Sequence, residues 1–220
     1  MMVDLRIYAL VDPERSGGAA LSDLARRVAH GGATLVQLRD KYGSTRRQVA
    51  QARAVKAALA LCAVPLIVND RADVALAAAA DGVHVGADDM SPQDARRLLG
   101  PAAIIGLSVK TVAQAEAAPV DALSYVCVGG IFATSSKKNP DPPIGIAGLR
   151  TILAGLRARA PHLPVAAIAG IDATNAAQVI AAGADGIAVI SALSLAPDPA
   201  AAAAGLRAVV DSGLATRVDP

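Results

Sequence analysis

The amino-acid sequence predicts an α/β fold, a single-domain (β/α)8 TIM barrel. Eight short apolar runs rich in β-branched residues alternate with eight longer segments of helical spacing. Such alternation gives parallel strands joined by helical crossovers. The apolar runs are nearly continuous, as in strands that are covered on both faces. A chain of 220 residues fits one barrel, so we expect a single catalytic domain over residues 1–220.

The predicted elements follow one another in a regular order. We expect strands at residues 5–11, 34–38, 65–69, 82–85, 103–107, 122–128, 165–169 and 186–190. Helices are expected at about 18–31, 44–62, 71–80, 91–99, 111–118, 145–159, 173–182 and 197–212. Three of these helices carry start signals, because Ser22, the pair Ser91-Pro92 and Asp172 are residue types that cap or begin helices.

An open, doubly wound sheet is the competing arrangement. The number of strands and the chain length favour the closed barrel. No G-x-G-x-x-G motif follows the first strand, which weakens the case for a dinucleotide-binding sheet. Glycines at positions 31, 32, 82, 183 and 186 stand where helices return to strands. We interpret them as helix C-caps without a function.

The composition narrows the classes of function. Aromatic residues make up 2% of the chain and the formal net charge is +2, which disfavours base stacking and a basic nucleic-acid surface. No apolar run reaches about 18 residues, the length of a membrane span, and no signal peptide is visible. We therefore expect a cytoplasmic protein that binds neither nucleic acid nor membrane. Cys62 and Cys127 stand alone in apolar runs, as two reduced, buried thiols would.

Polar residues collect where the predicted strands end. In a TIM barrel, the carboxyl ends of the strands form the active-site rim. Seven of the eight strands deliver polar or glycine-rich segments there, namely 37–41, 69–73, 86–89, 106–108, 129–138, 169–172 and 190–192. A single loop Asp would be interpreted as a helix cap, but seven converging segments indicate a binding site.

One half of this rim suits a metal-bound anion. Arg39, Lys41 and Lys137 are cations on different loops, and Asp70 and Asp89 are carboxylates after neighbouring strands. Mg²⁺ binds one or two carboxylates together with phosphate oxygens and waters. The alternative interpretation is a set of ordinary surface ion pairs, which contribute little to stability.

The other half suits a phosphate group. Gly170 allows close backbone approach, and Ser191 offers a hydroxyl at the end of the last strand. The loops after the seventh and eighth strands commonly bind phosphate in these barrels. The long segment 129–144 carries hydroxyls and lysines after paired glycines, which predicts a flexible flap that closes on phosphate. A disordered insertion is the alternative.

Covalent catalysis is not indicated by the sequence. His30, His84 and His162 are the histidines, and we expect none of them beside a nucleophile. His84 lies inside the fourth predicted strand, where a packed or hydrogen-bonded core histidine is the simpler interpretation. Cys127 lies in a strand with no His placed beside it. Departure of a diphosphate group, driven by electrostatic stabilisation, fits the rim better.

Several segments, each weak alone, stand in a specific order and spacing along almost the whole chain. They are Tyr8-Ala9-Leu10-Val11-Asp12, Val36-Gln37-Leu38-Arg39-Asp40-Lys41, Leu66-Ile67-Val68-Asn69-Asp70-Arg71, Asp81-Gly82-Val83-His84-Val85-Gly86, Asp89-Met90, Ile105-Gly106-Leu107-Ser108, Gly130-Ile131-Phe132 with 134–137, and 183–191. With them the chain resembles the thiamine-phosphate synthase family, also called thiamine-phosphate pyrophosphorylase.

The resemblance implies a reaction. It joins 4-amino-2-methyl-5-(diphosphooxymethyl)pyrimidine, here the pyrimidine diphosphate, to 4-methyl-5-(2-phosphooxyethyl)thiazole, here the thiazole phosphate. The products are thiamine phosphate and diphosphate. In this family diphosphate is thought to leave first, and the thiazole nitrogen attacks the remaining methylene cation. One Mg²⁺ bound with the diphosphate is the implied cofactor. The implied partners are these two small molecules, and a homo-oligomer is compatible with the sequence.

The resemblance also assigns residues by position. The pyrimidine diphosphate would be bound by Gln37, Leu38, Arg39, Asp40, Lys41, Asn69, Ser108 and Lys137, of which Arg39, Lys41, Ser108 and Lys137 would be catalytic. Mg²⁺ would be bound by Asp70 and Asp89. The thiazole phosphate would be bound by Thr134, Ser135, Ser136, Gly170, Ile190 and Ser191.

The chain departs from the family pattern in four places. Ala87-Asp88 stands before Asp89 in place of Gln-Glu, and residues 129–134 replace Gly-Pro-Ile-Phe-Pro-Thr, with Ala133 at the second Pro. Ser136 replaces the second Thr of Thr-x-Thr-Lys, and Ala169 replaces the first Gly of Gly-Gly-Ile. We expect activity to survive these replacements.

Three other functions are compatible with the predicted fold. A thiazole tautomerase would need a catalytic His at the rim and no metal carboxylates, but the fifth strand ends in Ser108. A non-catalytic ligand-binding barrel would have lost its charged rim. An isomerase of tryptophan or histidine biosynthesis would not need Arg39 and Lys41 together with Asn69-Asp70.

Overall fold

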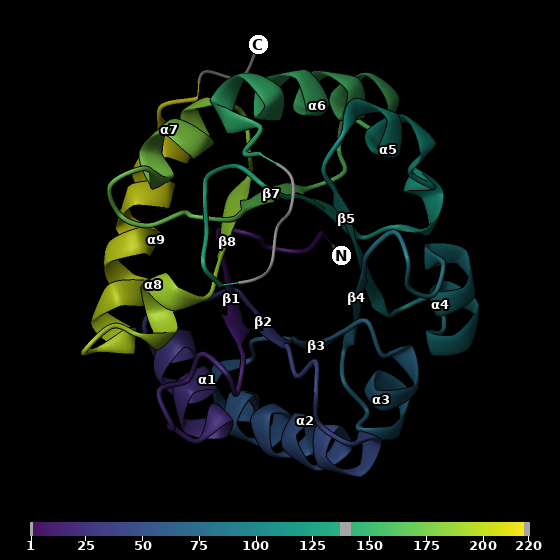
Figure 1. Cartoon of the computed structure of the whole chain (residues 1–220), viewed down its shortest axis with the longest axis vertical. Coiled ribbons are helices and arrows are strands. Elements are labelled where there is room, and N and C mark those ends of the chain that lie inside the picture. The colour runs from purple at the N-terminus through teal and green to yellow at the C-terminus, as the bar shows by residue number, and fades with distance from the viewer. Residues whose placement is uncertain (1, 137–141, 218–220) are drawn as a thin grey trace.

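The predicted barrel is confirmed by the computed structural model, which describes residues 2–136 and 142–217. The strands close in sequence order, with parallel pairing throughout, including β1 with β8. They are β1 (Ile7–Val11), β2 (Leu35–Leu38), β3 (Leu66–Asn69), β4 (Gly82–Val85), β5 (Ile104–Val109), β6 (Tyr125–Val128), β7 (Val165–Ile168) and β8 (Gly186–Val189). Figure 1 shows the helices in a ring around these strands.

All eight predicted helices are present in the described part of the chain. They are α1 (Leu21–His30), α2 (Thr45–Leu59), α3 (Ala72–Ala77), α4 (Pro92–Leu99), α5 (Val112–Ala117), α6 (Gly145–Arg159), α7 (Ala176–Ala181) and α9 (Pro199–Ala215). Two 3-10 turns, η1 (Ala60–Cys62) and η2 (Val120–Ala122), follow α2 and α5. The sequence did not predict α8 (Ser191–Ser194), a single turn after β8.

One of the three predicted helix starts is confirmed. Ser91 caps α4 by accepting a hydrogen bond from the Asp94 backbone N–H at 3.1 Å. The prediction for Ser22 is wrong, because α1 begins at Leu21 after Ala20. Asp172 does not cap α7, which begins at Ala176. Its carboxylate instead accepts from the Thr174 N–H in the preceding turn.

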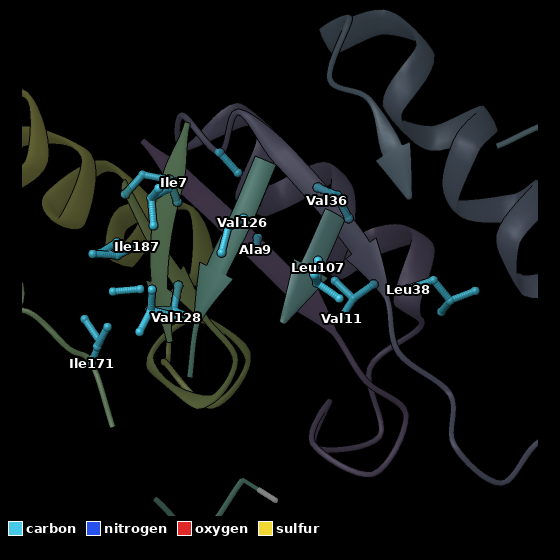
Figure 2. Close-up of a cluster of buried hydrophobic side chains, with 14 of the residues drawn as sticks. Ile7, Ala9, Val11, Val36, Leu38, Leu107, Val126, Val128, Ile171 and Ile187 are labelled. Atoms are coloured by element: carbon cyan, nitrogen blue, oxygen red, sulfur yellow. The ribbon is translucent and has the colours of Figure 1, made fainter. Parts of the chain in front are cut away.

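Each strand is covered on both faces, and its side chains alternate between two packed layers. On β1, Ile7, Ala9 and Val11 belong to the outer layer between the strands and the helices. Figure 2 shows part of this outer layer. Tyr8 and Leu10 point into the barrel and pack there with residues such as Ile67, Tyr125 and Ala188. Most of the barrel interior is therefore filled, and ligands must bind at an end.

Two of the glycines interpreted as helix C-caps have a different role. Gly82 and Gly186 are the first residues of β4 and β8. A Cβ at Gly82 would lie 1.9 Å from the Ile104 carbonyl oxygen, and one at Gly186 would lie 1.7 Å from that of Leu5. The C-cap interpretation is wrong for both, since close packing of neighbouring backbones excludes a side chain. It holds for Gly183, which follows α7 with φ +114°.

Two smaller expectations concern cysteines and membranes. Two buried thiols were expected, but Cys127 alone of the two cysteines is buried, while Cys62 is half-buried. In the described ranges, no helix has the length and apolar character that a membrane crossing requires.

Candidate active site

The loop after β2 delivers cations to the rim, and a buried carboxylate holds one of them. Arg39 follows β2 directly, and its guanidinium donates to the Asp12 carboxylate, which follows β1. The side chain of Asp12 is 2% exposed and that of Arg39 is 13% exposed. Asp12 also accepts from the Glu14 N–H at 2.8 Å. The pair fixes the guanidinium at the barrel mouth.

Lys41, Asp70 and Asp89 come together, as predicted from their places after neighbouring strands. The Lys41 Nζ lies 2.5 Å from Asp70 Oδ2. Asp89 accepts from the Gly86 N–H at 2.8 Å, which turns its loop back over β4. Burial raises the pKa of the Asp70 carboxyl, Lys41 acts in the opposite direction, and the nearby Asp89 carboxyl raises it again. Two close carboxylates, one of them costly to ionise, favour an added cation.

The backbone at Asp70 is unusual. Its φ is +63°, in the left-handed region that Asp and Asn tolerate better than most side chains. The Asp70 N–H donates to the His84 carbonyl at 2.7 Å, and the Arg71 N–H donates to the Asn69 carbonyl. This turn ends β3 and directs the carboxylate toward Lys41. Asn69 itself ends β3 beside His84.

Two predicted residues of the same half have clear structural roles. The Asp40 carboxylate accepts from the Tyr42 and Gly43 N–H groups, at 3.1 and 2.7 Å, and so shapes the loop after β2. The side chain of Leu38 is 1% exposed and belongs to the outer apolar layer. Leu38 can therefore offer a ligand only its backbone.

Ser108 has a histidine partner that the sequence analysis did not anticipate. Ser108 lies on β5 and His84 on the neighbouring β4, and His84 Nε2 is 2.8 Å from Ser108 Oγ. The sequence showed no obvious pair of nucleophile and base, and the structure places this imidazole beside the Ser108 hydroxyl. The expectation of a hydrogen-bonded core histidine is confirmed, since His84 is 6% exposed and its Nδ1 is 2.7 Å from the Tyr125 hydroxyl.

The half of the rim predicted to bind phosphate contains a cavity of about 380 Å³. It lies between the loops after β6, β7 and β8, and its wall includes Thr134, Ser135, Ser136, Gly170, Ile190 and Ser191. The hydroxyls of Ser136 and Ser191 lie 3.2 Å apart in its wall, within hydrogen-bond distance of each other. All six residues predicted for the thiazole phosphate therefore line one cavity.

The backbone at 169–170 needs a left-handed turn. Gly170 has φ +64°, and a Cβ there would lie 2.4 Å from the Ala133 carbonyl oxygen. The neighbouring Ala169 has φ +98°, which an L side chain adopts only with strain. Asn175, which the sequence analysis missed, donates to the Gly170 carbonyl at 2.8 Å and supports the turn.

Part of the predicted flap and one predicted residue cannot be compared with the structure. Lys137 and the rest of 137–141 lie outside the described residues. On the described side, the Phe132 N–H donates to the Ala169 carbonyl at 3.0 Å and fixes the start of the segment against β7. The Arg15 side chain donates to the Ser135 carbonyl at 2.5 Å. The loop after β1 thus contacts the segment after β6.

A closed parallel barrel with charged and hydroxyl groups gathered at the carboxyl ends of its strands defines a TIM-barrel enzyme. The family model described as thiamine monophosphate synthase matches residues 7–193. This chain therefore belongs to the thiamine monophosphate synthase family, whose members are transferases of thiamine biosynthesis. The resemblance predicted from the motifs is confirmed.

Full-length relatives agree with the family model. The chain is 52% identical to the thiamine-phosphate synthase of Agrobacterium fabrum over 215 residues, which cover 98% of each chain. It is 48% identical to that of a Roseiflexus species over 96% of this chain and 87% of the relative.

Solved structures support the same fold. The thiamine phosphate pyrophosphorylase of Pyrococcus furiosus superposes with a TM-score of 0.83 at 34% identity, covering 96% of this chain and 98% of that one. Tryptophan synthase from M. tuberculosis superposes with a TM-score of 0.68 at 17% identity over 94% and 93% of the two chains. That second likeness concerns the barrel fold alone.

Proposed function

We propose that this chain makes thiamine phosphate from the pyrimidine diphosphate and the thiazole phosphate, with one half of the rim binding each substrate. The observation that supports this division is that charged groups and hydroxyl groups lie on different parts of the rim. Cations and the acidic pair lie after β2, β3 and β4, and the hydroxyl-lined cavity lies after β6, β7 and β8. A diphosphate needs several charges, whereas a monophosphate ester is satisfied by hydroxyls and backbone N–H groups.

The diphosphate half fits one Mg²⁺. Among the described residues no group of three or more His, Cys, Asp or Glu side chains could hold a metal ion, so an ion held by protein alone is not supported. Asp70 and Asp89 instead form a two-carboxylate site of the kind that Mg²⁺ completes with phosphate oxygens and waters. When bound, Mg²⁺ would neutralise charge on the diphosphate.

The remaining groups of this half would bind and orient the pyrimidine diphosphate. The Asp12 carboxylate holds the Arg39 guanidinium at the mouth, where it would donate to the diphosphate together with Lys41. Gln37 is 1% exposed, and its Oε1 has no hydrogen-bond partner among the described residues. That oxygen would accept from the amino group of the pyrimidine. Asn69 and Ser108 would complete the half, and Lys137 would add a third cation.

Bond breaking would depend on electrostatic stabilisation. As the carbon–oxygen bond to diphosphate lengthens, negative charge grows on the leaving group, and Arg39, Lys41 and the Ser108 hydroxyl would stabilise it. Diphosphate leaves with the bonding electron pair, and the thiazole nitrogen then forms the new carbon–nitrogen bond with the remaining methylene cation. Ser136, Gly170 and Ser191 would hold the thiazole phosphate so that its ring faces the reacting carbon.

The Ser191→Ala variant tests the assignment of the two halves. Losing one hydroxyl from the phosphate cavity should raise the KM for the thiazole phosphate roughly 5-fold, the effect of one hydrogen bond, with little change in the KM for the pyrimidine diphosphate. The Arg39→Lys variant is the matched change in the other half and should show the opposite pattern. If Ser191→Ala raised mainly the KM for the pyrimidine diphosphate, the assignment would be reversed. Isomerisation of the thiazole phosphate alone would instead indicate a tautomerase.

A further inference from the structure

The loop after β1, residues 12–16 and here called the β1 loop, contacts both halves of the rim. In the closed barrel β1 lies between β8 and β2, so this loop borders both halves. On one side the Asp12 carboxylate holds the Arg39 guanidinium. On the other side the Arg15 guanidinium donates to Ser135, in the segment after β6. This second contact lies next to the hydroxyls that line the proposed thiazole phosphate cavity.

Hydrogen bonds within the β1 loop fix the backbone of Arg15. Its N–H donates to the Asp12 carbonyl at 3.0 Å, and the Glu14 N–H donates to the Asp12 carboxylate at 2.8 Å. The Ser16 hydroxyl donates to the Pro13 carbonyl at 3.4 Å. The side chains of Asp12 and Ser16 are buried. The Arg15 guanidinium therefore extends from a backbone that is anchored in the protein.

The peptide group that joins Ser135 to Ser136 is held at both of its polar atoms. Its carbonyl accepts from Arg15 Nη2 at 2.5 Å. Its N–H, which belongs to Ser136, donates to Thr134 Oγ1 at 3.1 Å. The carbonyl and the N–H of a trans peptide lie in one plane and point in opposite directions. The two hydrogen bonds therefore fix this plane from both sides, and with it the position of the Ser136 Cα.

The fixed peptide group carries a hydroxyl into the cavity. The Ser136 hydroxyl lies 3.2 Å from that of Ser191 in the cavity wall. Both hydroxyls can donate to an anion, whereas the Ser135 carbonyl oxygen can only accept and would repel one. Arg15 is not among the described residues that line the cavity, so it contacts that carbonyl from outside. The contact satisfies the acceptor and leaves the Ser136 hydroxyl available beside Ser191.

Direct binding of the phosphate is the competing role for Arg15, because a guanidinium is a common ligand of phosphate groups. Two observations favour positioning instead. The Arg15 side chain already donates to a backbone carbonyl at 2.5 Å, and it lies outside the described wall of the cavity.

We propose that Arg15 is a positioning residue that fixes the peptide group between Ser135 and Ser136 and so places the Ser136 hydroxyl in the phosphate cavity. The identity of that phosphate, as part of the thiazole substrate, rests on the proposed function. Arg15 acts through Ser136 and does not contact the substrate itself. Because Asp12 of the same loop holds Arg39, one short loop then supports a binding group in each half of the rim.

Backbone NMR relaxation of the substrate-free protein tests the positioning. The Ser136 amide should have an order parameter of about 0.85, that of rigid backbone, and Arg15→Met should lower it below about 0.6. Met keeps an apolar side chain of similar length and removes the donors. Arg26→Met is the matched control and should leave the Ser136 amide unchanged, because Arg26 contacts Asp23 on its own helix, α1. Equal order parameters in the wild-type protein and Arg15→Met would overturn the proposal.

Steady-state kinetics test whether the position of Ser136 matters for binding. Arg15→Met should raise the KM for the thiazole phosphate roughly 5-fold, the effect of one hydrogen bond. The kcat and the KM for the pyrimidine diphosphate should stay near their wild-type values. Arg15→Lys should recover most of the affinity, since an ammonium group can donate to the same carbonyl. A loss confined to kcat would overturn the proposal.

A double-mutant cycle separates positioning from direct binding. In the Ser136→Ala background, Arg15→Met should raise the KM for the thiazole phosphate by less than about 2-fold more, because residues that act through one another are not additive. If Arg15 bound the phosphate itself, the effects of the two substitutions would multiply. That result would overturn the proposal.

The NMR and kinetic experiments distinguish failure of the inference from failure of the proposed function. Loss of order at Ser136 in Arg15→Met without a rise in the KM for the thiazole phosphate would overturn the inference alone. If the wild-type protein made no thiamine phosphate, the proposed function would fail. The order parameters would then still decide whether Arg15 holds Ser136 in place, since they are measured without substrate.

Discussion

At the scale of single residues, the charged groups of the rim are held by buried or half-buried partners. Arg39 lies on the Asp12 carboxylate, and Lys41 lies on Asp70. Breaking such a buried pair from one side leaves an uncompensated charge and costs far more than losing an exposed ion pair. Substitutions of these residues will therefore change stability and activity by separate routes, and stability must be measured beside turnover.

Arg39→Met should lower the free energy of unfolding by about 3 kcal/mol, because the buried Asp12 carboxylate loses its partner. Adding Asp12→Asn should recover most of that loss, since Asn keeps an acceptor for the Glu14 N–H. Both variants should bind the pyrimidine diphosphate more weakly than the wild-type protein, because both lack Arg39. Urea unfolding and steady-state kinetics measure the two effects. Wild-type stability in Arg39→Met would show that the pair has no structural role.

Asp70→Asn should abolish turnover that depends on Mg²⁺ and raise stability in metal-free buffer. The pKa of Asp70 is raised above its usual value of 3.8, so its ionised form opposes folding above that pH. The gain in stability over wild type should be largest at neutral pH and disappear as the pH falls toward 3.8.

Thermal unfolding across this pH range measures that difference. Asp121→Asn, an exposed site on η2, is the control and should change neither property. A variant less stable than wild type at neutral pH would contradict the assignment. Asn suits this test better than Ala, because φ at position 70 is +63° and Asn tolerates that region.

The role of a residue could be predicted where a charged or polar side chain stands near the end of a predicted strand. Lys41, Asp70 and Asp89 could be brought together because each lies in the loop that follows a strand, and parallel strands end at one rim. The contact between His84 and Ser108 depends on which residues of β4 and β5 point inward. Side chains alternate between the two faces of a strand, which leaves two possible sets of inward-facing residues. The register of the strand with its neighbours decides which set faces inward. The Asp12–Arg39 pair gave no local signal, since 27 residues separate its members.

At the scale of elements, the order of strands and helices was predictable and the short connections were not. Continuous apolar runs and helical spacing repeat eight times, which fixes the architecture even where element ends move by several residues. The turn α8 has four residues, too few for any periodic pattern. The close backbone contacts at Gly82 and Gly186 also produce no periodic pattern in the sequence, so they could not be predicted from it.

Gly186→Ala should destabilise the barrel by at least about 3 kcal/mol, because backbone atoms cannot move aside for the new methyl as a side chain can. A Cβ there would lie 1.7 Å from the Leu5 carbonyl oxygen, at the junction of β1 and β8. Gly155→Ala is the control, since no atom lies within 4 Å of the new Cβ in α6. It should stabilise the protein by about 0.5–1 kcal/mol. Equal stability of the two variants, measured by urea unfolding, would contradict this account of barrel closure.

At the scale of the whole molecule, the barrel places the charged groups and the hydroxyl-lined cavity on opposite sides of one mouth. The strand order puts β2, β3 and β4 together on one side and β6, β7 and β8 on the other. Inside the barrel, hydrogen bonds link the side chains of Gln37, Tyr8, Tyr125, His84 and Ser108. Each substrate would therefore be held by its own loops, and the reacting atoms would meet above the barrel axis.

The most direct measurement is diphosphate release from the pure protein mixed with both substrates, first with Mg²⁺ and then with excess chelator. The account predicts release that requires the thiazole phosphate, stops on chelation, and matches the thiamine phosphate formed mole for mole. Release without thiamine phosphate, or thiamine phosphate formed equally well in chelator, would contradict it.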